Sequence, residues 1–346
     1  MSTNNSKKKV IVIGAGFAGY NAVRVLEKSN RFSITLIDRE NHNLFQPMLY
    51  QVATGLIPIV SVAVPIRYLI NKSTKFIQGE VSDIEFQHKI IHLNQKKLSF
   101  DYLIICAGSK YQYFNTDWKK YTHSLKTASD AISMKDHILN SFEQAEIESD
   151  PDQKKKLLSF CIIGGGATGV EICGSITDLI DTKLIQHFHN ISRDEITISL
   201  IEAGDRLLSS FSDRSSHIAF HDLSKKGGDI KLSEKVVSIT SGLVKTSKAV
   251  YSANTIIWCV SLVSSLNHII DESYTDHSGR IIVDEFLSMR AFPDVYCLGD
   301  ASRAVDENNE PYPGLASVAK QQGVYAARDI IDRVKKNKRM KFHLRI

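Results

Sequence analysis

Short apolar runs alternate with helical segments along most of the chain. Val10–Ile13 consists of four consecutive β-branched residues, which predicts a buried parallel strand. Tyr20–Glu27 has helical character without a helix breaker, and Ile34–Ile37 predicts a second buried strand. A strand, a helix and a second strand in this order predict a βαβ unit at the start of the chain.

Three glycines separate the first strand from the first helix. Gly14, Gly16 and Gly19 have the G-x-G-x-x-G spacing. The first glycine of this motif allows a tight turn, the second lets a pyrophosphate approach the backbone, and the third lets the helix pack closely on the strand. Asp38 follows the second strand and is placed to accept hydrogen bonds from a ribose diol. The motif therefore predicts a dinucleotide site at the helix N-terminus.

The middle of the chain continues with strands and one long helix. Tyr102–Cys106 predicts a buried strand that stops at Ala107 and Gly108, and this end either passes its backbone along a cofactor or forms a plain turn. The remaining predictions are a helical pattern over Val64–Leu69, alternating β-structure over Phe76–Leu93 with a turn near Gln87–Lys89, and a helix over Ser129–Ile147 that ends near Pro151.

The opening pattern then returns. Gly164, Gly166 and Gly169 repeat the glycine spacing 150 residues later, between a strand over Phe160–Ile163 and a helix from Val170. The next strand, Ile196–Ile201, ends in Glu202, so the chain contains an internal duplication with two nucleotide-binding units. A carboxylate at the ribose position would repel a 2′-phosphate, which favours NADH over NADPH. Arg206 is the counter-argument, although it is expected to pair with a surface carboxylate.

The last third of the chain adds a Gly-Asp pair after a late strand. Thr255–Val260, Ile281–Val283 and Asp294–Leu298 predict strands, Gly299–Asp300 follows them, and Ser317–Val334 predicts a closing helix. Two dinucleotide sites and this pair fit a flavoprotein that binds FAD in its first site and a nicotinamide in its second, with hydride transfer between them.

Composition narrows the choice of electron acceptor. The chain has 346 residues, 43% of them hydrophobic, and a net charge of +5, which suits two soluble domains and gives no argument for nucleic acid. Five scattered cysteines without a C-x-x-C pair exclude dithiol chemistry and indicate a reducing, cytosolic-type compartment. The acceptor is therefore a quinone, oxygen or a redox protein. No cluster has metal-ligand spacing, so no metal is predicted.

Several longer segments resemble type II NADH:quinone oxidoreductases, the single-subunit NADH dehydrogenases that do not pump protons. The resemblance covers nearly the whole chain, and its first segment is the most specific. The segments are NHNLFQPMLYQVATG at 41–55, GGGATGVE at 164–171, EAGDRLL at 202–208, VYCLGDA at 295–301 and PGLASVAKQQG at 313–323.

The resemblance implies an architecture and a reaction. The fold would be α/β, with a discontinuous FAD-binding Rossmann-like domain at 1–120 and 285–346. An NADH-binding Rossmann-like domain at 121–284 would be inserted into it, with β-meander connections. The protein would pass electrons from NADH through FAD to a membrane quinone of a respiratory chain. It would lie peripherally on the cytoplasmic side of the membrane, or be soluble if a short C-terminus removes the attachment, and it could form a homodimer.

The resemblance also assigns individual roles. Glu171 would orient NADH and deliver a proton to the quinone, with a plain complement to the helix dipole as the less favoured alternative. Gln321 and Gln322 would lie near the flavin ring and the quinone, although one or both could be plain helix residues. The cofactor-binding residues would be Gly14, Gly16, Phe17, Ala18, Gly19, Asp38, Arg39, Gln46, Pro47, Val81, Ala107, Gly108, Gly164, Gly166, Thr168, Gly169, Glu202, Ser261, Gly299, Asp300 and Lys320.

The chain departs from the family pattern in three places. Ser261 stands where the family has glycine, so its Cβ would hinder close approach of the nicotinamide, and Ser317 replaces a glutamine of the quinone site. The chain ends at Ile346, whereas family members usually continue into membrane-associated helices. The basic residues from Arg333 to Arg345 would either contact anionic lipid or form a solvated end. Residues 1–6 are expected to be a disordered leader.

These departures leave two alternatives. One is a different flavin reductase of the same superfamily, such as a sulfide:quinone or ferredoxin-type reductase, although sulfide chemistry would need a cysteine pair at the flavin. The other is a shortened paralogue that binds FAD without quinone turnover.

Overall fold

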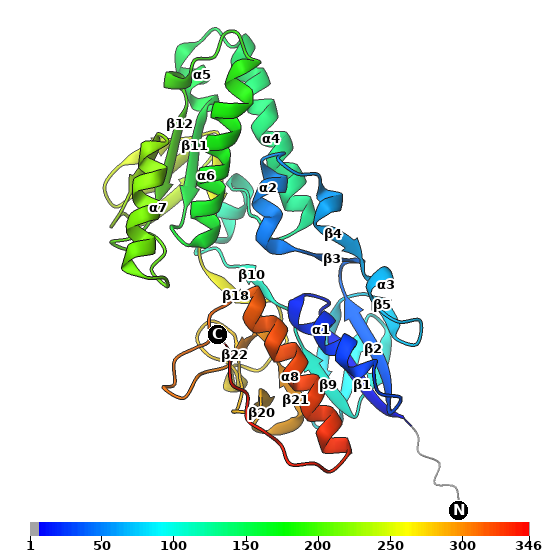
Figure 1. Cartoon of the computed structure of the whole chain (residues 1–346). Coiled ribbons are helices and arrows are strands. Elements are labelled where there is room, and N and C mark those ends of the chain that lie inside the picture. Colours follow the sequence, from blue (N-terminus) through cyan, green and yellow to red (C-terminus); the bar gives the residue numbers. More distant parts are fainter. Residues whose placement is uncertain (1–6, 346) are drawn as a thin grey trace, which may run out of the picture. The chain divides into compact units, whose positions relative to one another are not determined.

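The computed structural model describes residues 7–345, which divide into two compact units (Figure 1). The first unit contains residues 7–44, 63–110 and 262–345, and the second contains residues 45–62 and 111–261. These boundaries differ from the predicted ones at 120 and 284. The segment 45–62 also packs with the second unit, although it precedes that unit in the sequence. The leader predicted over residues 1–6 lies outside the described residues.

The first unit is built on a six-stranded sheet in the order β20-β21-β9-β1-β2-β5. All neighbouring strands run parallel except β20 and β21, which are antiparallel. The strands are β1 (Lys8–Ile13), β2 (Phe32–Asp38), β5 (Lys75–Gln78), β9 (Tyr102–Ile105), β20 (Ser288–Met289) and β21 (Phe292–Cys297). Val10–Ile13 is buried along its whole length, as expected for the centre of a parallel sheet.

Two helices from opposite ends of the chain pack on each other in the first unit. Figure 1 shows α8 (Ala316–Val334), in orange-red, beside α1 (Phe17–Leu26), in blue. The close packing depends on Gly323, because a Cβ atom at this position would lie 2.1 Å from the carbonyl oxygen of Ala18. Any larger side chain would therefore push the two helices apart.

Smaller elements complete the first unit. A three-stranded antiparallel sheet has the order β6-β7-β8, and its β6–β7 turn includes Lys89 at a φ of +54°, as predicted for Gln87–Lys89. The helical pattern predicted over Val64–Leu69 is only partly right, because Pro65 interrupts it. The elements are β3 (His42–Leu44), β4 (Ala63–Pro65), α3 (Ile66–Leu69), β6 (Val81–Glu85), β7 (Ile90–Leu93), β8 (Lys96–Ser99), β10 (Ser109–Tyr111), β18 (Leu262–Ser264), β19 (Ile281–Ile282), η7 (Gly299–Ala301) and β22 (Ser302–Arg303).

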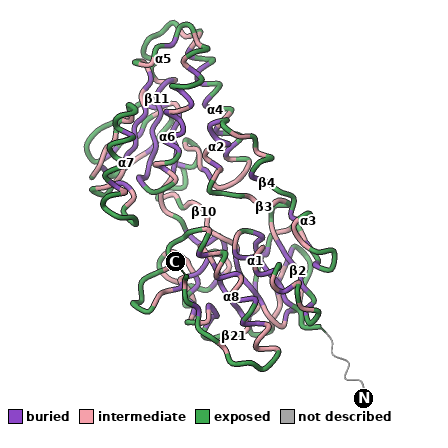
Figure 2. The backbone as a smooth tube through the Cα atoms, in the orientation of Figure 1, coloured by how far each residue is buried: buried purple, intermediate pink, exposed green. Residues whose placement is uncertain are grey.

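The second unit is built on a four-stranded parallel sheet in the order β13-β12-β11-β17. A three-stranded antiparallel sheet, β14-β15-β16, lies between β13 and β17 in the sequence, as β6-β7-β8 lies between β5 and β9 in the first unit. The strands are β11 (Ser159–Ile163), β12 (Thr197–Ile201), β13 (Gly228–Lys231), β14 (Val236–Thr240), β15 (Leu243–Thr246), β16 (Val250–Ser252) and β17 (Thr255–Trp258). Figure 2 shows buried backbone along β11 and α6.

Helices flank the sheet of the second unit, and α4 and α5 begin at side-chain caps. Thr127 and Asp130 form a capping box at α4, and the Asp150 side chain caps α5 with Pro151 in its first turn. Pro151 therefore begins a second helix, in addition to following the end of the first. The helices are η1 (Gln46–Met48), α2 (Leu49–Ala53), α4 (Ala128–Ile147), α5 (Pro151–Leu157), α6 (Ala167–Thr182) and α7 (Asp213–Lys225).

Candidate dinucleotide-binding sites

The first glycine loop forms an open cradle between β1 and α1. Gly14 has a φ of +97°, and a Cβ atom there would lie 2.2 Å from the carbonyl oxygen of Cys106. A Cβ at Gly19 would lie 1.9 Å from the carbonyl oxygen of Gly14, whereas one at Gly16 would meet nothing within 4 Å. No side chain caps the N-terminus of α1 at Gly16. The open space and the uncapped helix end both fit the phosphates of a dinucleotide.

Asp38 is held against this loop by backbone hydrogen bonds. Its Oδ2 accepts a hydrogen bond from the Ala15 N–H at 2.6 Å, and its Oδ1 accepts one from the Glu40 N–H at 2.9 Å. Burial raises the pKa of the Asp38 carboxyl, while the two backbone donors act in the opposite direction. The carboxylate lies at the end of β2, where the ribose of a dinucleotide is bound in this fold.

The second glycine loop repeats this geometry. Gly164 has a φ of +109°, a Cβ at Gly169 would lie 1.8 Å from the carbonyl oxygen of Gly164, and Gly166 faces open space. Glu202 accepts hydrogen bonds from the Gly165 N–H at 2.6 Å and the Gly204 N–H at 2.7 Å. No side chain caps α6 at Gly166. This loop therefore also fits a dinucleotide.

Arg206, the basic side chain weighed against Glu202 as a contact for a 2′-phosphate, is paired with a carboxylate, as predicted. The Arg206 guanidinium donates to Asp213 at 2.6 Å and to the carbonyl oxygen of Ser209 at 2.7 Å. These contacts use the side chain that could otherwise have bound a 2′-phosphate.

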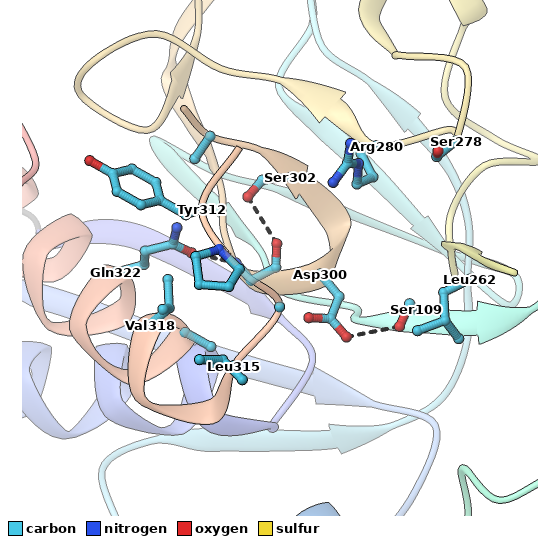
Figure 3. Close-up of a pocket in the computed structure, with 15 residues that line it drawn as sticks. Ser109, Leu262, Ser278, Arg280, Asp300, Ser302, Tyr312, Leu315, Val318 and Gln322 are labelled. Carbon is cyan, nitrogen blue, oxygen red and sulfur yellow. Dashed lines mark hydrogen bonds between the residues drawn. The ribbon is translucent and has the colours of Figure 1, made fainter. Parts of the chain in front are cut away.

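A cavity of about 250 Å³ surrounds the Gly-Asp pair of the first unit (Figure 3). Asp300 lies in η7, and its Oδ2 accepts a hydrogen bond from the Ser109 hydroxyl at 2.8 Å. Arg280 also lines the cavity and forms an ion pair at 2.8 Å with Asp276, whose side chain is almost fully buried. The pattern of strand ends did not identify Ser109, Arg280 or Tyr312. Ser109 could have been found from its position directly after Ala107–Gly108.

The three predicted residues of α8 lie in different environments. Gln322 is buried and lines the cavity, where its Oε1 accepts a hydrogen bond from the Gly299 N–H at 2.7 Å. Gln321 instead pairs with the backbone of Arg345, donating to its carbonyl oxygen at 3.0 Å and accepting from its N–H at 2.9 Å. Lys320 is exposed and does not line the cavity. Gln322 thus holds the turn that carries Asp300.

The segment after α8, residues 335–345, is docked along the first unit. Phe342 is 7% exposed, and the Tyr325 hydroxyl donates to the carbonyl oxygen of Met340 at 2.6 Å. Arg339 donates two hydrogen bonds to one oxygen of the buried Asp329, at 3.0 and 2.7 Å. The segment is therefore held at Phe342 and Arg339, while its lysines remain exposed to solvent.

In the second unit, Thr168 lies at the start of α6, Ser261 lies after β17, and Tyr111 ends β10. Ser261 has a φ of +56°, a left-handed conformation that favours glycine. Its carbonyl oxygen accepts a hydrogen bond from the Gln112 N–H at 2.8 Å. Burial raises the pKa of the Tyr111 hydroxyl, while the Thr168 side chain, at the start of α6, acts in the opposite direction. The substitution at 261 thus keeps the backbone conformation of a glycine at the cost of some strain.

Glu171 lies in the second turn of α6, two residues after Gly169. It is exposed, but desolvation by the surrounding protein raises the pKa of its carboxyl. A raised pKa lets the carboxyl hold a proton at a higher pH than an ordinary glutamate does. This property suits a group that gives up a proton.

Other predicted cofactor residues are distributed over both units. Gln46 and Pro47 lie in η1 of the second unit, and the Gln46 amide donates to the carbonyl oxygen of Lys126 at 3.3 Å. Val81 is buried at the start of β6, and Gly108 has a φ of +68° after β9. Arg39 is exposed, and its carbonyl oxygen accepts a hydrogen bond from Gln78 at 3.1 Å. Of these five positions, only Gly108 directly adjoins the cavity residue Ser109.

The five cysteines are free, and four of them are buried. Burial raises the pKa of the Cys161, Cys173 and Cys259 thiols to about 12 in each case. Thiols of this kind remain protonated at neutral pH and are poor nucleophiles.

Comparisons with known proteins give a consistent result. A family model described as pyridine nucleotide-disulphide oxidoreductase matches residues 8–323. A type II NADH:quinone oxidoreductase of Mycobacterium tuberculosis, Ndh, is 31% identical over 94% of this chain and 72% of its own length. The type II NADH:quinone oxidoreductase of Staphylococcus saprophyticus is 26% identical over 94% of this chain and 82% of its own length. NDH2 from Plasmodium falciparum, solved in complex with NADH, has the same fold, with a TM-score of 0.85 at 20% identity over 94% of this chain and 83% of that one.

Proposed function

The chain belongs to the pyridine nucleotide-disulphide oxidoreductase family and, within it, to the type II NADH:quinone oxidoreductases, and from this premise we propose which of its residues perform the reaction. The reaction passes electrons from NADH through FAD to a quinone, without proton pumping. Bound FAD supplies the redox chemistry, since it can take a hydride from NADH and give two electrons to a quinone. The protein supplies binding, orientation and protons.

The first unit binds FAD. Its pyrophosphate lies over Gly14, Gly16 and Gly19 at the N-terminus of α1, and its adenosine ribose hydrogen-bonds to Asp38. Asp300 binds the ribityl or phosphate region. The hydrogen bonds from Ser109 to Asp300 and from Gly299 to Gln322 support this assignment, because they fix the turn from two sides.

The second unit binds NADH. The paired glycine loops, each with an open central glycine and an acid bonded to the loop backbone, are the single observation that carries this assignment. Glu202 accepts hydrogen bonds from the ribose hydroxyls and disfavours the 2′-phosphate of NADPH. Glu171 orients the nicotinamide end and gives up a proton during quinone reduction, a role supported by its raised pKa.

An anaerobic titration tests both half-reactions in the purified, FAD-loaded chain. NADH should bleach the flavin absorbance, and a short-chain quinone added afterwards should restore it. The Glu171→Gln variant should still bind NADH but reoxidise more slowly, and wild-type reoxidation should slow as the pH rises through the pKa of Glu171. A flavin that remains oxidised in NADH would contradict the proposed function.

One observation favours a second candidate, a paralogue that binds FAD without quinone turnover. Both polar ends of the Gln321 amide are used by the backbone of Arg345, so this side chain does not line the cavity around Asp300. The same titration separates the two candidates. A flavin that NADH bleaches but no quinone reoxidises would support the paralogue.

We also propose peripheral contact with anionic lipid on the cytoplasmic side of a membrane. Within residues 7–345, no helix combines the length and the apolar character that crossing a bilayer requires. Lys335, Lys336, Lys338 and Lys341 are exposed on the docked segment and support a surface attachment. A homodimer remains a prediction from the family resemblance.

A further inference from the structure

We propose that Glu234, a buried residue outside both glycine loops, is a positioning residue that fixes the Glu202 carboxylate and thereby contributes to the choice of NADH over NADPH. The inference rests on the proposed role of the second unit in binding NADH. Glu234 is 4% exposed and lies immediately before the three-stranded sheet, between β13 and β14. Its side chain reaches that sheet, and its backbone contacts Glu202.

The backbone around Glu202 is held by the turn that contains Glu234. The Glu202 N–H donates to the carbonyl oxygen of Lys231 at 2.8 Å, and the Glu202 carbonyl oxygen accepts from the Glu234 N–H at 3.0 Å. The Ser233 N–H donates to the carbonyl oxygen of Gly204 at 2.7 Å, and the Gly204 N–H in turn binds the Glu202 carboxylate. Movement of this turn would therefore change the position of Glu202.

The Glu234 side chain attaches the turn to the three-stranded sheet. Its Oε1 accepts hydrogen bonds from the Thr246 hydroxyl at 2.5 Å and the Tyr251 hydroxyl at 2.8 Å. Thr246 ends β15 and Tyr251 is the middle residue of β16, so one carboxylate oxygen joins the turn to two strands. Hydrogen bonds to a buried carboxylate are among the stronger ones in proteins.

The first unit shows that the backbone arrangement does not itself need a carboxylate. There the Gly79 N–H donates to the carbonyl oxygen of Asp38 at 2.8 Å, as Glu234 does to Glu202. Gly79 precedes β6 as Glu234 precedes β14, and it has no side chain. The carboxylate is therefore a feature of the second cradle alone, the cradle that discriminates between two nicotinamide nucleotides.

Asp38 and Glu202 differ in side-chain length and in how their hydrogen-bond donors are held. This difference explains why Glu202 needs an attachment through Glu234 and Asp38 does not. Asp38 is one methylene shorter than Glu202, so its carboxylate is closer to the main chain and has fewer rotatable bonds. Glu202 is longer, and one of its two donors, Gly204, is itself held by the turn. An external attachment through Glu234 compensates for the longer side chain.

Binding of oxidised nucleotides tests the inference without depending on turnover. We would measure the Kd of NAD⁺ and NADP⁺ for the FAD-loaded chain by isothermal titration calorimetry. The variants are Glu234→Leu, Glu234→Gln and Tyr251→Phe, with Glu143→Leu on the exposed face of α4 as the control. Thermal unfolding is recorded for each variant.

Glu234→Leu should weaken NAD⁺ binding about tenfold, the factor expected for one lost hydrogen bond to a charged group, and leave NADP⁺ nearly unchanged. Glu234→Gln keeps an acceptor oxygen and should largely restore the preference for NAD⁺. The preference of Tyr251→Phe should lie between those of the two Glu234 variants.

Equal weakening of the binding of both nucleotides, or an unchanged ratio of the two Kd values in a folded Glu234→Leu variant, overturns the inference. If Glu234→Leu does not fold, an unchanged ratio in Tyr251→Phe overturns it. Wild-type protein that binds NAD⁺ but does not reduce quinone contradicts the proposed function instead.

Discussion

Among single residues, Ser261 has a conformation that its own side chain disfavours. Its φ of +56° costs a non-glycine residue about 1 kcal/mol relative to glycine. Ser261→Gly should therefore raise the free energy of unfolding of the second unit by about 1 kcal/mol, measured by urea unfolding, and tighten NADH binding. Ser238→Gly in the interior of β14 is the control and should lower stability by about 0.5–1 kcal/mol. Equal effects of the two changes would contradict the strain at Ser261.

His123 makes the second unit sensitive to acid. Burial, and then the neighbouring His137 ring at 4.3 Å between centroids, lower the pKa of His123 to about 4. The unfolded chain binds this proton near pH 6.5 and the folded chain only near pH 4, so stability falls as the pH drops through this window. The loss should reach about 3 kcal/mol at pH 4.

The pH dependence of urea unfolding checks this prediction. His123→Asn should remove most of the loss between pH 6.5 and pH 4, leaving the smaller contribution of His137, whose pKa burial also lowers. The exposed His217→Asn variant should unfold like wild type at every pH. An unchanged pH dependence in His123→Asn would refute the assignment.

Among the helices, the packing of α1 on α8 depends on one glycine, Gly323. Gly323→Ala would place a methyl group 2.1 Å from the carbonyl oxygen of Ala18, and a backbone atom cannot yield as a side chain can. The first unit should lose about 1–3 kcal/mol of stability and release FAD more readily, measured by thermal unfolding and by flavin retention on gel filtration.

Gly174→Ala is the matched control, since it lies inside α6 and its new methyl group would stand 3.5 Å from Leu223. It should stabilise the second unit by up to about 1 kcal/mol through helix propensity. A neutral Gly323→Ala variant would show that the two helices can separate without loss.

The elements that the sequence predicted are those with strong local signals. Val10–Ile13, Ile34–Ile37 and the helix before Pro151 have uniform periods or clear breakers, and all three occur in the structure. Val64–Leu69 was misjudged because its apolar spacing is helical while Pro65 leaves only one helical turn. The local pattern also identified Asp38, which ends β2, and Glu202, which directly follows β12.

Contacts between distant segments could not be predicted in this way. The buried hydrogen bond at 2.7 Å between Thr54 and Ser175 fastens α2 to α6, so the segment 45–62 packs with the second unit. The role of Gln322 at Gly299 likewise depends on a separation of 23 residues along the chain. Neither contact has a signature in the sequence around it.

For the whole molecule, each nucleotide should stabilise its own unit. A ligand at 100 times its Kd adds about 2.7 kcal/mol to the stability of the unit that binds it. In calorimetric thermal unfolding, removal of FAD should lower the transition temperature of the first unit, and NAD⁺ should raise the transition temperature of the second unit. A single transition whose temperature both ligands shift equally would contradict the prediction that each nucleotide stabilises its own unit.

The pairing of α1 with α8 also has a consequence for synthesis of the protein. The partners are separated by 299 residues, from Phe17 to Ala316. At translation rates of about 5–20 residues per second, α1 waits roughly 15–60 seconds before its partner leaves the ribosome. The second unit, whose last residue is Ser261, emerges complete before then. On the proposed assignment, a nascent chain would therefore complete its NADH site before α8 completes its FAD site.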